Sequence, residues 1–392
     1  MEQQVKRHSL LLLPVILISY FIVGFPDGAF TISWLGIERD LNLTIAHSGY
    51  ILVGYSVTYT LAGVVLSGLN RFLKLQTIYF FGLTIMGLGF IGLALSINFI
   101  MALMAITIYG FGTGAMASSM NSYMAKHFTA RHNNWMHCFW GGGAAISPLI
   151  MGRMMDTHSW SAGYFVITAI LALVAIILLV SMYAKVWTND DTDSSNNLTH
   201  ESSNKTVAKK RYLAKKWHQA VEILTFFFLG GTDYTLVFFT GMVLIERGFE
   251  DVAIFSAVYY LSMTVGRMFF GYAAKWLQEP PIIRIGITIA ALGILVLYFT
   301  SNIVGMALTG FGLGPLLPTL VSDSSNRFTP QVLSKIVGYE LAAFGAGIAV
   351  LFFITSLILE HITLEALFPI GLTFVVLVFL CNEVLERAAR GK

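Results

Sequence analysis

The fold of this chain is decided by one stretch near its start, Tyr20-Phe-Ile-Val-Gly-Phe-Pro-Asp27-Gly-Ala-Phe-Thr-Ile-Ser-Trp34. This stretch places a carboxylate in the middle of the first long apolar run. A charge at that depth in a bilayer costs at least about 2.5–3.5 kcal/mol, so it is kept only where it faces protein or a water-filled cavity. Gly24, Pro26 and Gly28 surround Asp27, and each weakens regular helical hydrogen bonding. We therefore expect an interrupted first membrane helix with Asp27 at its break.

The composition of the whole chain indicates a polytopic membrane protein. Of 392 residues, 56% are apolar and only 11% are charged, with 30 Phe and 36 Gly, which lies outside the range of soluble domains. We expect an all-α polytopic membrane protein with twelve transmembrane helices, because twelve apolar runs are long enough to cross a hydrocarbon core of about 30 Å. The runs are 10–37, 45–69, 75–97, 99–124, 133–155, 161–184, 218–245, 252–276, 281–300, 302–323, 331–358 and 363–383.

The positions of Lys and Arg predict the orientation. If both termini are cytoplasmic, all of the 24 basic residues lie on the inner side except Arg39, Arg153, Arg247 and Arg267. Such a bias sets the orientation of a membrane protein and agrees with an even number of spans. We expect an integral protein of a bacterial cytoplasmic membrane with both termini in the cytoplasm. As partners we expect the lipid bilayer and a small-molecule substrate, no nucleic acid, and no second copy of the chain.

A polar segment divides the chain into two halves. Residues 188–204 are rich in Asn, Asp, Ser and Thr, a composition that cannot form a packed core, and a basic run at 209–217 follows. A basic run beside a membrane sets topology and meets anionic lipid. We expect an N-terminal six-helix bundle over 1–187, a flexible basic cytoplasmic linker over 188–216 and a C-terminal six-helix bundle over 217–392.

The two halves repeat each other. Gly110-Phe-Gly-Thr-Gly114 recurs as Gly310-Phe-Gly-Leu-Gly314, and Gly24-Phe-Pro-Asp27 recurs as Gly230-Gly-Thr-Asp233. Repeats of this kind form pseudo-symmetric halves with a binding site between them. We expect each half to begin with a discontinuous helix that carries an aspartate, which is typical of an alternating-access carrier.

Several further motifs make the chain resemble the major facilitator superfamily, and within it the fucose permease and its sugar-permease-like relatives. The matching pieces are Gly24-Phe-Pro-Asp27-Gly28, Asn121-Ser-Tyr123, His137-Cys-Phe-Trp-Gly-Gly-Gly143, Ser147-Pro148, Gly266-Arg267, Gly271, Gly314-Pro315, Pro318-Thr319, Gly338-Tyr-Glu340 and Ala342-Ala343. The resemblance implies the major facilitator fold and a central cavity lined by the first, fourth, seventh and tenth helices. It also implies proton-coupled uptake, with the aspartate of the first helix as a proton or substrate group.

Two positions depart from that family pattern. Ala117 stands where the fucose permease has a glutamate, four residues before Asn121, so proton coupling by that carboxylate is excluded. In the loop between the second and third helices, Asn70 replaces the usual aspartate beside Arg71, which weakens the charge latch expected there. We assign Asn70 and Arg71 a gating or structural role.

Three acids lie deep in the predicted spans and are candidates for proton coupling: Asp27, Asp233 and Glu340. Low dielectric disfavours their ionised forms, and two acids that face one cavity repel each other when both are charged. Asp27 can bind a proton or a sugar hydroxyl; the alternative is an acid neutralised by a structural partner such as Asn121. For Asp233 the alternative is a structural hydrogen bond to Thr232, Thr235 or a neighbouring helix.

Arg267 and His137 allow two interpretations each. Arg267 binds backbone carbonyls or Asp323, or it forms an ion pair with Asp233 or Glu340 that breaks during transport and acts as a gate. We place Arg267 and Asp323 in a gating or structural group. His137 is a packed, hydrogen-bonded side chain or part of the inner cavity wall.

Aromatic and neutral polar residues supply the candidates for sugar binding. Pyranose rings present apolar faces and hydroxyl edges, which aromatic rings and hydrogen-bonding groups recognise. The alternative is a position at the membrane interface, where Tyr and Trp also gather. The candidates are Asp27, Trp34, Tyr55, Tyr59, Asn121, His137, Trp140, Tyr234 and Tyr339.

No motif indicates an enzyme. A phosphate-binding glycine loop with Lys and Ser is missing, and Cys138 and Cys381 provide neither a disulfide framework nor a metal site. We therefore expect no cofactor and no metal, with energy taken from a proton gradient. The predicted function is a proton-coupled secondary carrier of a small neutral or weakly polar solute, a sugar. The alternatives are a proton-coupled exporter of amphiphilic drugs or lipids, and a sensor that keeps the fold without transport.

Overall fold

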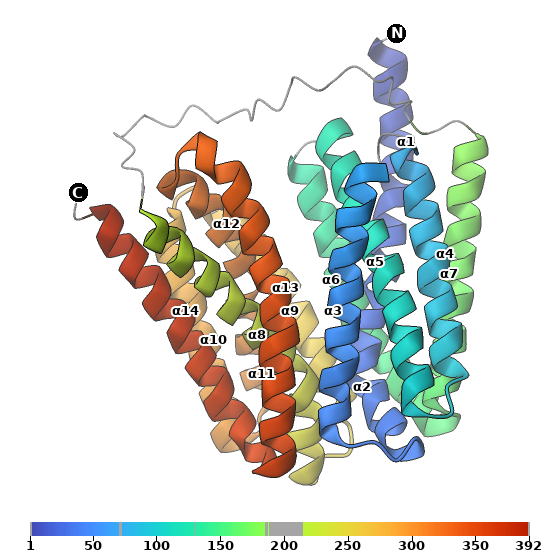
Figure 1. Cartoon of the computed structure of the whole chain (residues 1–392), viewed down its shortest axis with the longest axis vertical. Coiled ribbons are helices and arrows are strands. Elements are labelled where there is room, and N and C mark those ends of the chain that lie inside the picture. The colour runs from blue at the N-terminus through green and yellow to red at the C-terminus, as the bar shows by residue number, and fades with distance from the viewer. Residues whose placement is uncertain (1, 70–72, 129, 185–186, 188–214, 391–392) are drawn as a thin grey trace.

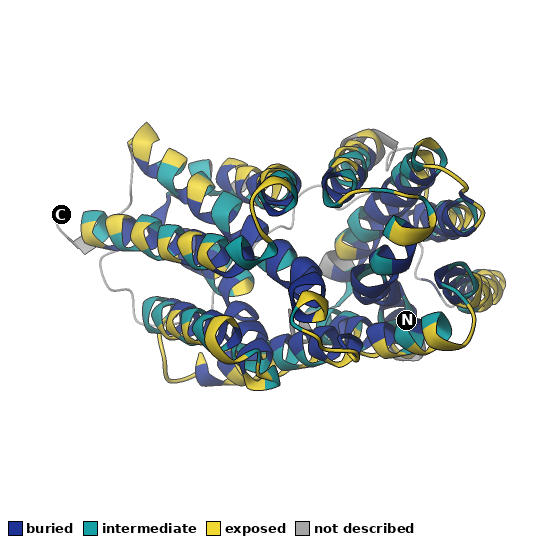
Figure 2. Ribbon diagram, turned by 90° about the horizontal axis from the view of Figure 1, so that it is seen from below, coloured by how far each residue is buried: buried dark blue, intermediate teal, exposed yellow. Residues whose placement is uncertain are grey.

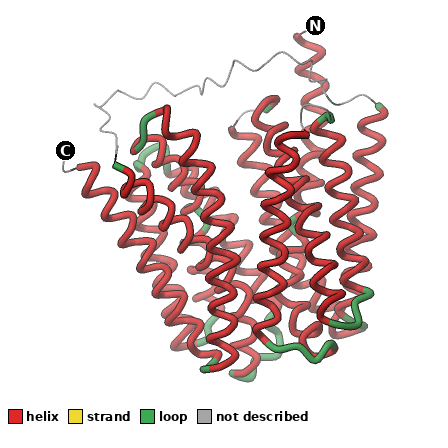
Figure 3. Tube along the Cα trace, in the orientation of Figure 1, coloured by secondary structure: helices red, strands yellow, loops and turns green. Residues whose placement is uncertain are grey.

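The computed structural model describes residues 2–69, 73–128, 130–184, 187 and 215–390, and every regular element within them is helical (Figure 3). The first seven helices are α1 Glu2–Val23, α2 Phe25–Asp40, α3 Ile45–Leu69, α4 Leu75–Ala94, α5 Phe99–His127, α6 Ala130–Thr157 and α7 Trp160–Tyr183. The others are α8 Lys216–Glu246, α9 Ala253–Ala273, α10 Glu279–Thr300, α11 Ile303–Leu313, α12 Leu316–Arg327, α13 Pro330–His361, the short 3₁₀ helix η1 Leu364–Ala366, and α14 Leu367–Arg390.

These helices make twelve membrane-spanning segments, as the apolar runs predicted. Helices α1 and α2 follow one another with a single residue between them, and α11 and α12 with two, so each pair counts as one segment. Within the described residues, ten segments qualify as membrane spans by their length and hydropathy alone. The predicted fold class, an all-α polytopic membrane protein, is confirmed.

The segments form two bundles that lie side by side, α1–α7 in one and α8–α14 in the other (Figure 1). Both chain termini lie at the same end, which we call the terminal end; the opposite end is the distal end. The bundles touch mainly where α3 meets α13 and where α6 meets α9, and α2 also contacts α8 and α9. The predicted linker, 188–216, lies outside the described residues except for Lys215 and Lys216.

The outer faces of the bundles are apolar and exposed, as membrane contact requires. On α7, Leu173, Ile176 and Val180 are each more than half exposed and recur at helical spacing. Viewed from the distal end, exposed residues lie mainly on the perimeter and buried residues toward the interior (Figure 2). An exposed apolar surface of this extent is expected only where lipid covers it.

The first segment is interrupted where the sequence predicted. Helix α1 ends at Val23, Gly24 caps α2, and Pro26 lies in the first turn of α2, a position where its missing N–H leaves no helical bond unmade. The corresponding prediction for the second half is wrong. Helix α8 runs unbroken past Asp233, because Thr232 stands where the first half has a proline and the glycines before it serve close packing instead.

Glycines hold α6 against α1 and α2. A Cβ on Gly24 would overlap the carbonyl oxygen of Trp140, and a Cβ on Gly143 would overlap the carbonyl oxygen of Phe21. These are backbone contacts, which small residues allow between membrane helices. The close approach brings the Trp140 side chain next to the start of α2, where Asp27 lies.

Replacing Gly143 by Ala should therefore destabilise the protein, since overpacking costs about 1–3 kcal/mol and lowers the melting temperature by several degrees. Gly271→Ala is the matched control, because a Cβ there meets no atom within 4 Å; it should leave the melting temperature unchanged or slightly raised. Thermal unfolding in detergent, followed by tryptophan fluorescence, measures both. Equal stability of the two variants would contradict this packing.

Candidate functional site

The carboxylate of Asp27 is bonded by both halves of the protein. The indole Nε1–H of Trp140, on α6, donates to Oδ2 of Asp27 at 3.0 Å, and the hydroxyl of Tyr234, on α8, donates to Oδ1 at 3.3 Å. Trp140 belongs to the same bundle as Asp27, and Tyr234 belongs to the other. Hydrogen bonds to a charged acceptor are stronger than those between neutral groups, so ionised Asp27 draws the second bundle toward the first.

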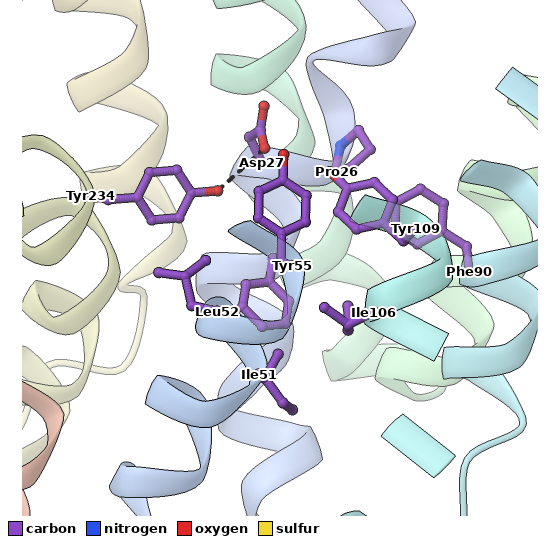
Figure 4. Close-up of a pocket in the computed structure, with 10 residues that line it drawn as sticks. Pro26, Asp27, Ile51, Leu52, Tyr55, Phe90, Ile106, Tyr109 and Tyr234 are labelled. Carbon is purple, nitrogen blue, oxygen red and sulfur yellow. Dashed lines mark hydrogen bonds between the residues drawn. The ribbon is translucent and has the colours of Figure 1, made fainter. Parts of the chain in front are cut away.

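Asp27 lies at the edge of an aromatic pocket, shown in Figure 4. Its space, including what is continuous with open solvent, is about 320 Å³. Asp27 is the only one of its lining residues with a formal charge, so the pocket offers one ionic group in apolar and aromatic surroundings. The lining residues are Pro26, Asp27, Phe30, Ile51, Leu52, Tyr55, Phe90, Ile106, Tyr109 and Tyr234.

The aromatic side of the pocket is a stack of rings from three helices. Tyr55 on α3 stacks on Tyr109 on α5, with centroids 5.2 Å apart and planes at 22°. Phe90 on α4 packs on the other side of Tyr109 at 4.6 Å, and Tyr59 continues the stack from Tyr55 at 5.8 Å. The stack offers flat apolar faces with phenol hydroxyls at their edges.

A cation from the second half lies next to the same tryptophan. The guanidinium of Arg267, on α9, is 5.7 Å from the ring centroid of Trp140, within the range of a cation–π interaction. Its Nε donates to the carbonyl oxygen of Gly314 at 3.0 Å. Trp140 therefore links an arginine of one half with the aspartate of the other.

The second aspartate is bound within its own half. The hydroxyl of Tyr259, on α9, donates to Oδ1 of Asp233. Asp233 is close enough to Asp27 for the two charges to interact, and Arg267 attracts it, yet no ion pair within 4 Å joins Arg267 to a carboxylate among the described residues. Repulsion between two ionised aspartates favours states in which one of them is neutral.

The two halves close the site at the distal end. The backbone N–H of Ala46, at the start of α3, donates to Oε2 of Glu360, near the end of α13, at 2.6 Å. Tyr50 packs on Phe353 with centroids 4.9 Å apart, and Phe30 on Phe238 at 5.5 Å. Each of these contacts joins one half to the other, so the two halves meet at the distal end in this conformation.

A membrane-spanning chain of two repeated six-segment halves, with a buried acid and an aromatic pocket between them, has the architecture of a carrier. The family model described as Major Facilitator Superfamily matches residues 16–339. The chain belongs to the major facilitator superfamily. It is a membrane transporter of that type, and the resemblance inferred from the sequence is confirmed.

Two curated relatives of this major facilitator protein have different substrates. The chain is 21% identical over 314 residues to the multidrug efflux pump SdrM of Staphylococcus aureus (strain N315), covering 79% of this chain and 62% of the pump. It is 19% identical over 316 residues to the glucose/mannose transporter GlcP of Bacillus subtilis (strain 168), covering 76% of each. The chain thus spans less than two thirds of the length of the pump.

Solved transporters share the fold over almost the whole chain. A bacterial homologue of the human lysosomal transporter Spinster, inward-facing and unoccupied, has a TM-score of 0.73 at 13% identity, covering 98% of this chain and 97% of the homologue. The major facilitator transporter FucP in its outward conformation has a TM-score of 0.60 at 16% identity, covering 96% and 99%. At these identities the likeness shows the fold alone.

The other candidates from the sequence are spread over the molecule. Trp34 is buried against Phe30 and Phe238 toward the distal end, and His137 meets the edge of Tyr20. Asn121 and Tyr339 are exposed, and Asn121 is not a hydrogen-bond partner of Asp27.

The candidates for gating also separate. Arg267 does not bind Asp323, because Asp323 pairs with Arg327 one turn away at 2.6 Å. Glu340 lies in the same part of the second half, fully buried. Asn70 and Arg71 fall outside the described residues, so their predicted role remains a prediction.

Some site residues were not singled out from the sequence. Tyr109 directly precedes the repeated motif Gly110-Phe-Gly-Thr-Gly114, and that position was a usable signal. Phe90 and Ile106 gave none, because apolar residues within apolar runs do not reveal which face they occupy.

The bonds to Asp27 can be measured as coupling energies. Trp140→Phe removes one donor and Tyr234→Phe the other, and each should cost about 1–3 kcal/mol if its partner is a charged group. In an Asp27→Ala background both effects should shrink by about 1 kcal/mol or more, since the acceptor is gone. Thermal unfolding of the single and double variants completes this double-mutant cycle and gives the coupling energy of each hydrogen bond. Trp276→Phe is the control, because Trp276 is exposed; fully additive effects would contradict the shared acceptor.

Proposed function

We propose that the protein is a proton-coupled secondary carrier that moves a small neutral or weakly polar organic solute, a sugar, by alternating access. The observation that carries the proposal is the position of Asp27. Its carboxylate lies at the interruption of the first segment, faces the aromatic pocket and accepts hydrogen bonds from both halves.

Proton coupling follows from the chemistry of those bonds. A neutral carboxylic acid is a weaker acceptor than a carboxylate, so a proton on Asp27 weakens the bond from Tyr234 and with it one link between the halves. A solute hydroxyl that donates to Asp27 competes with the same bond. Proton and solute therefore act on one contact, which is the requirement for coupling their movements.

The pocket suits a sugar in two respects. The stacked rings of Tyr55 and Tyr109 provide an apolar face, and their hydroxyls with Asp27 provide hydrogen-bonding edges. The transporter GlcP, to which the chain is similar over 76% of its length, acts on glucose and mannose. We extend that substrate class to this chain as part of the proposal.

The remaining expectations complete the proposal. The carrier works as a monomer in a bacterial cytoplasmic membrane, with both termini in the cytoplasm and no cofactor or enzymatic step. In that orientation the distal end faces outward, and the contacts of Glu360 and Phe353 make this conformation closed to the outside. The direction of net transport depends on the proton gradient and the solute gradient together.

A specific observation favours a second candidate, an exporter of amphiphilic cations. Apart from Asp27, the pocket is lined by apolar and aromatic side chains, among them Phe30, Ile51 and Leu52, and a single acid in such surroundings attracts a hydrophobic cation. The similar protein SdrM is a multidrug efflux pump. This candidate keeps the same role for Asp27 and changes only the solute.

Asp27→Asn should separate proton coupling from solute exchange. In proteoliposomes, accumulation driven by a proton gradient should fall at least tenfold, while counterflow of labelled solute persists, because the amide still offers an acceptor but cannot exchange a proton. Glu365→Gln is the control acid, since Glu365 pairs with Arg247 at the distal end. Unchanged proton-driven accumulation in the Asp27→Asn protein would contradict the proposal.

Thermal-shift screening chooses between the two solutes. If the first proposal holds, monosaccharides should raise the melting temperature and should support counterflow. If hydrophobic cations stabilise the protein and no monosaccharide does, the sugar proposal is wrong and the export of amphiphilic cations is favoured.

A further inference from the structure

The second half contains a buried polar cluster that is separate from the pocket. It is formed by Glu222 of α8, Asp323, Ser324 and Arg327 of α12, Glu340 of α13, and Asn382 and Glu386 of α14. All of these helices belong to the same bundle. Helix α12 and the first turns of α8 and α13 lie at the terminal end (Figure 1).

The charges of the cluster do not balance. Glu222 and Glu340 are 0% exposed, Asp323 is 3% exposed, and Arg327 is 2% exposed. If every acid were ionised, these three negative charges would face one positive charge, and Glu386 would add a fourth. Uncompensated charge at such burial is too costly to keep, so at least one of the acids carries a proton.

The hydroxyl of Ser324 identifies which pair shares that proton. Its Oγ lies 2.6 Å from Oε1 of Glu340 and 3.1 Å from Oε1 of Glu222, and the carbonyl oxygen of Leu320 is also at 3.1 Å. A hydroxyl has one proton to donate and two lone pairs that accept. Two ionised carboxylates cannot share this one proton, for which the Leu320 carbonyl, an acceptor only, also competes, so one of the two carboxyl groups donates to Ser324 Oγ.

The surroundings assign the proton to Glu340. Oε2 of Glu222 receives a hydrogen bond from Arg327 Nη1 at 3.0 Å, which stabilises its ionised form. Oε2 of Glu340 is buried and has no hydrogen-bond partner. An ionised carboxylate with a buried oxygen that has no hydrogen-bond partner is higher in free energy than a neutral acid in the same place.

We propose that Glu340 holds a proton that it donates to Ser324 Oγ, while the Ser324 hydroxyl donates to ionised Glu222. The bridge is a second proton-binding site, away from the solute pocket. Concerted transfer of the acidic proton from Glu340 to Ser324 Oγ and of the Ser324 hydroxyl proton to Glu222 Oε1 moves the negative charge from Glu222 to Glu340, and no proton is gained or lost. The inference deepens the proposed function. A role for this proton in transport rests on that function, whereas the presence of the proton on Glu340 does not.

The bridge is placed to affect the contact between the halves. It joins α8 to α13, and α13 is the helix that packs against α3 of the first half. Loss of the proton would leave two carboxylates about one hydroxyl apart, and their repulsion would push α13 from α8. The other titratable or charged groups that face the bridge from described residues are Arg327 on α12 and Cys381 and Glu386 on α14, with Asp323 on α12 and Glu279 on α10 behind Arg327.

Infrared spectroscopy of the purified full chain tests the proton directly. The wild type at neutral pH should show carbonyl absorption of a buried protonated carboxylic acid, and Glu340→Gln should lose one such component. Glu383→Gln is the control, because Glu383 is paired with Arg284 outside the bridge, and it should keep the component. Absence of the component from the wild type, or its persistence in Glu340→Gln, would overturn the proposal.

Thermal stability gives a second, independent readout. Glutamine resembles the neutral acid, so Glu340→Gln should melt within about 2 °C of the wild type, whereas a loss of more than about 5 °C would mean that an ionised, paired carboxylate had been removed. If Glu340→Gln does not fold, Ser324→Ala replaces it in the infrared test. That variant should shift the carbonyl frequency, because the acidic proton loses its acceptor, and an unshifted band would overturn the bridge.

Failure of the proposed function has a different signature. If Asp27→Asn leaves proton-driven accumulation unchanged while the infrared component is lost only in Glu340→Gln, the proposed role of Asp27 in proton coupling is wrong. The proposal of a second proton site at Glu340 is then still supported. If Asp27→Asn abolishes proton-driven accumulation but Glu340→Gln keeps the infrared component, the second proton site is wrong and the proposed carrier function is supported.

Discussion

One carboxylate bonded from two bundles is the constraint on which the rest of this structure depends. Asp27 cannot lie in a lipid environment without partners, and its partners come from different halves: Trp140 from its own and Tyr234 from the other. An acid satisfied within one bundle would only stabilise that bundle. An acid satisfied across the boundary makes the relative position of the halves depend on its charge.

The local sequence explains how the carboxylate reaches this position. Gly24 and Pro26 end one helix and start another, which turns Asp27 toward the boundary without a buried, unpaired N–H at the proline. The glycines of α6 bring its backbone against α1 and α2, and Trp140 follows from that contact. Arg267, placed over the Trp140 ring, adds a positive charge from the second half. Packing of small residues and placement of charge thus serve the same site.

Much of the fold could be predicted from the sequence because bilayer thickness and the length of the apolar runs are strong physical constraints. The break at Asp27 was also predictable, because proline and glycine act locally. The assumption that Gly230 and Gly231 break the second half was wrong, since glycine alone permits a helix to continue where a neighbouring helix packs closely.

The candidate site was less accessible from the sequence. Tyr55, Trp140 and Tyr234 were recognised as types of residue that bind sugars, but Trp34, which has the same chemistry, lies in the packing toward the distal end. The apolar pocket residues Phe90 and Ile106 carry no signal in a chain rich in Phe and Ile. The bridge at Ser324 depends on Glu222, which lies 102 residues earlier in the chain, and a single sequence does not show that two such distant residues are in contact. The similarity to a sugar transporter and to a multidrug pump leaves the solute to experiment.

The account is tested most directly by the distance between the halves at each end, measured by pulsed electron paramagnetic resonance on spin-labelled pairs in lipid. One pair, at Ile97 and Glu250, reports the distal end, and the other, at Leu73 and Trp276, reports the terminal end; all four side chains are exposed. Acidification should lengthen the distal distance and shorten the terminal one in the wild type, because a proton on Asp27 weakens its bond to the second half. Asp27→Asn should show the acidic distribution at every pH. Identical, pH-dependent distributions in both proteins would contradict a central role for this carboxylate.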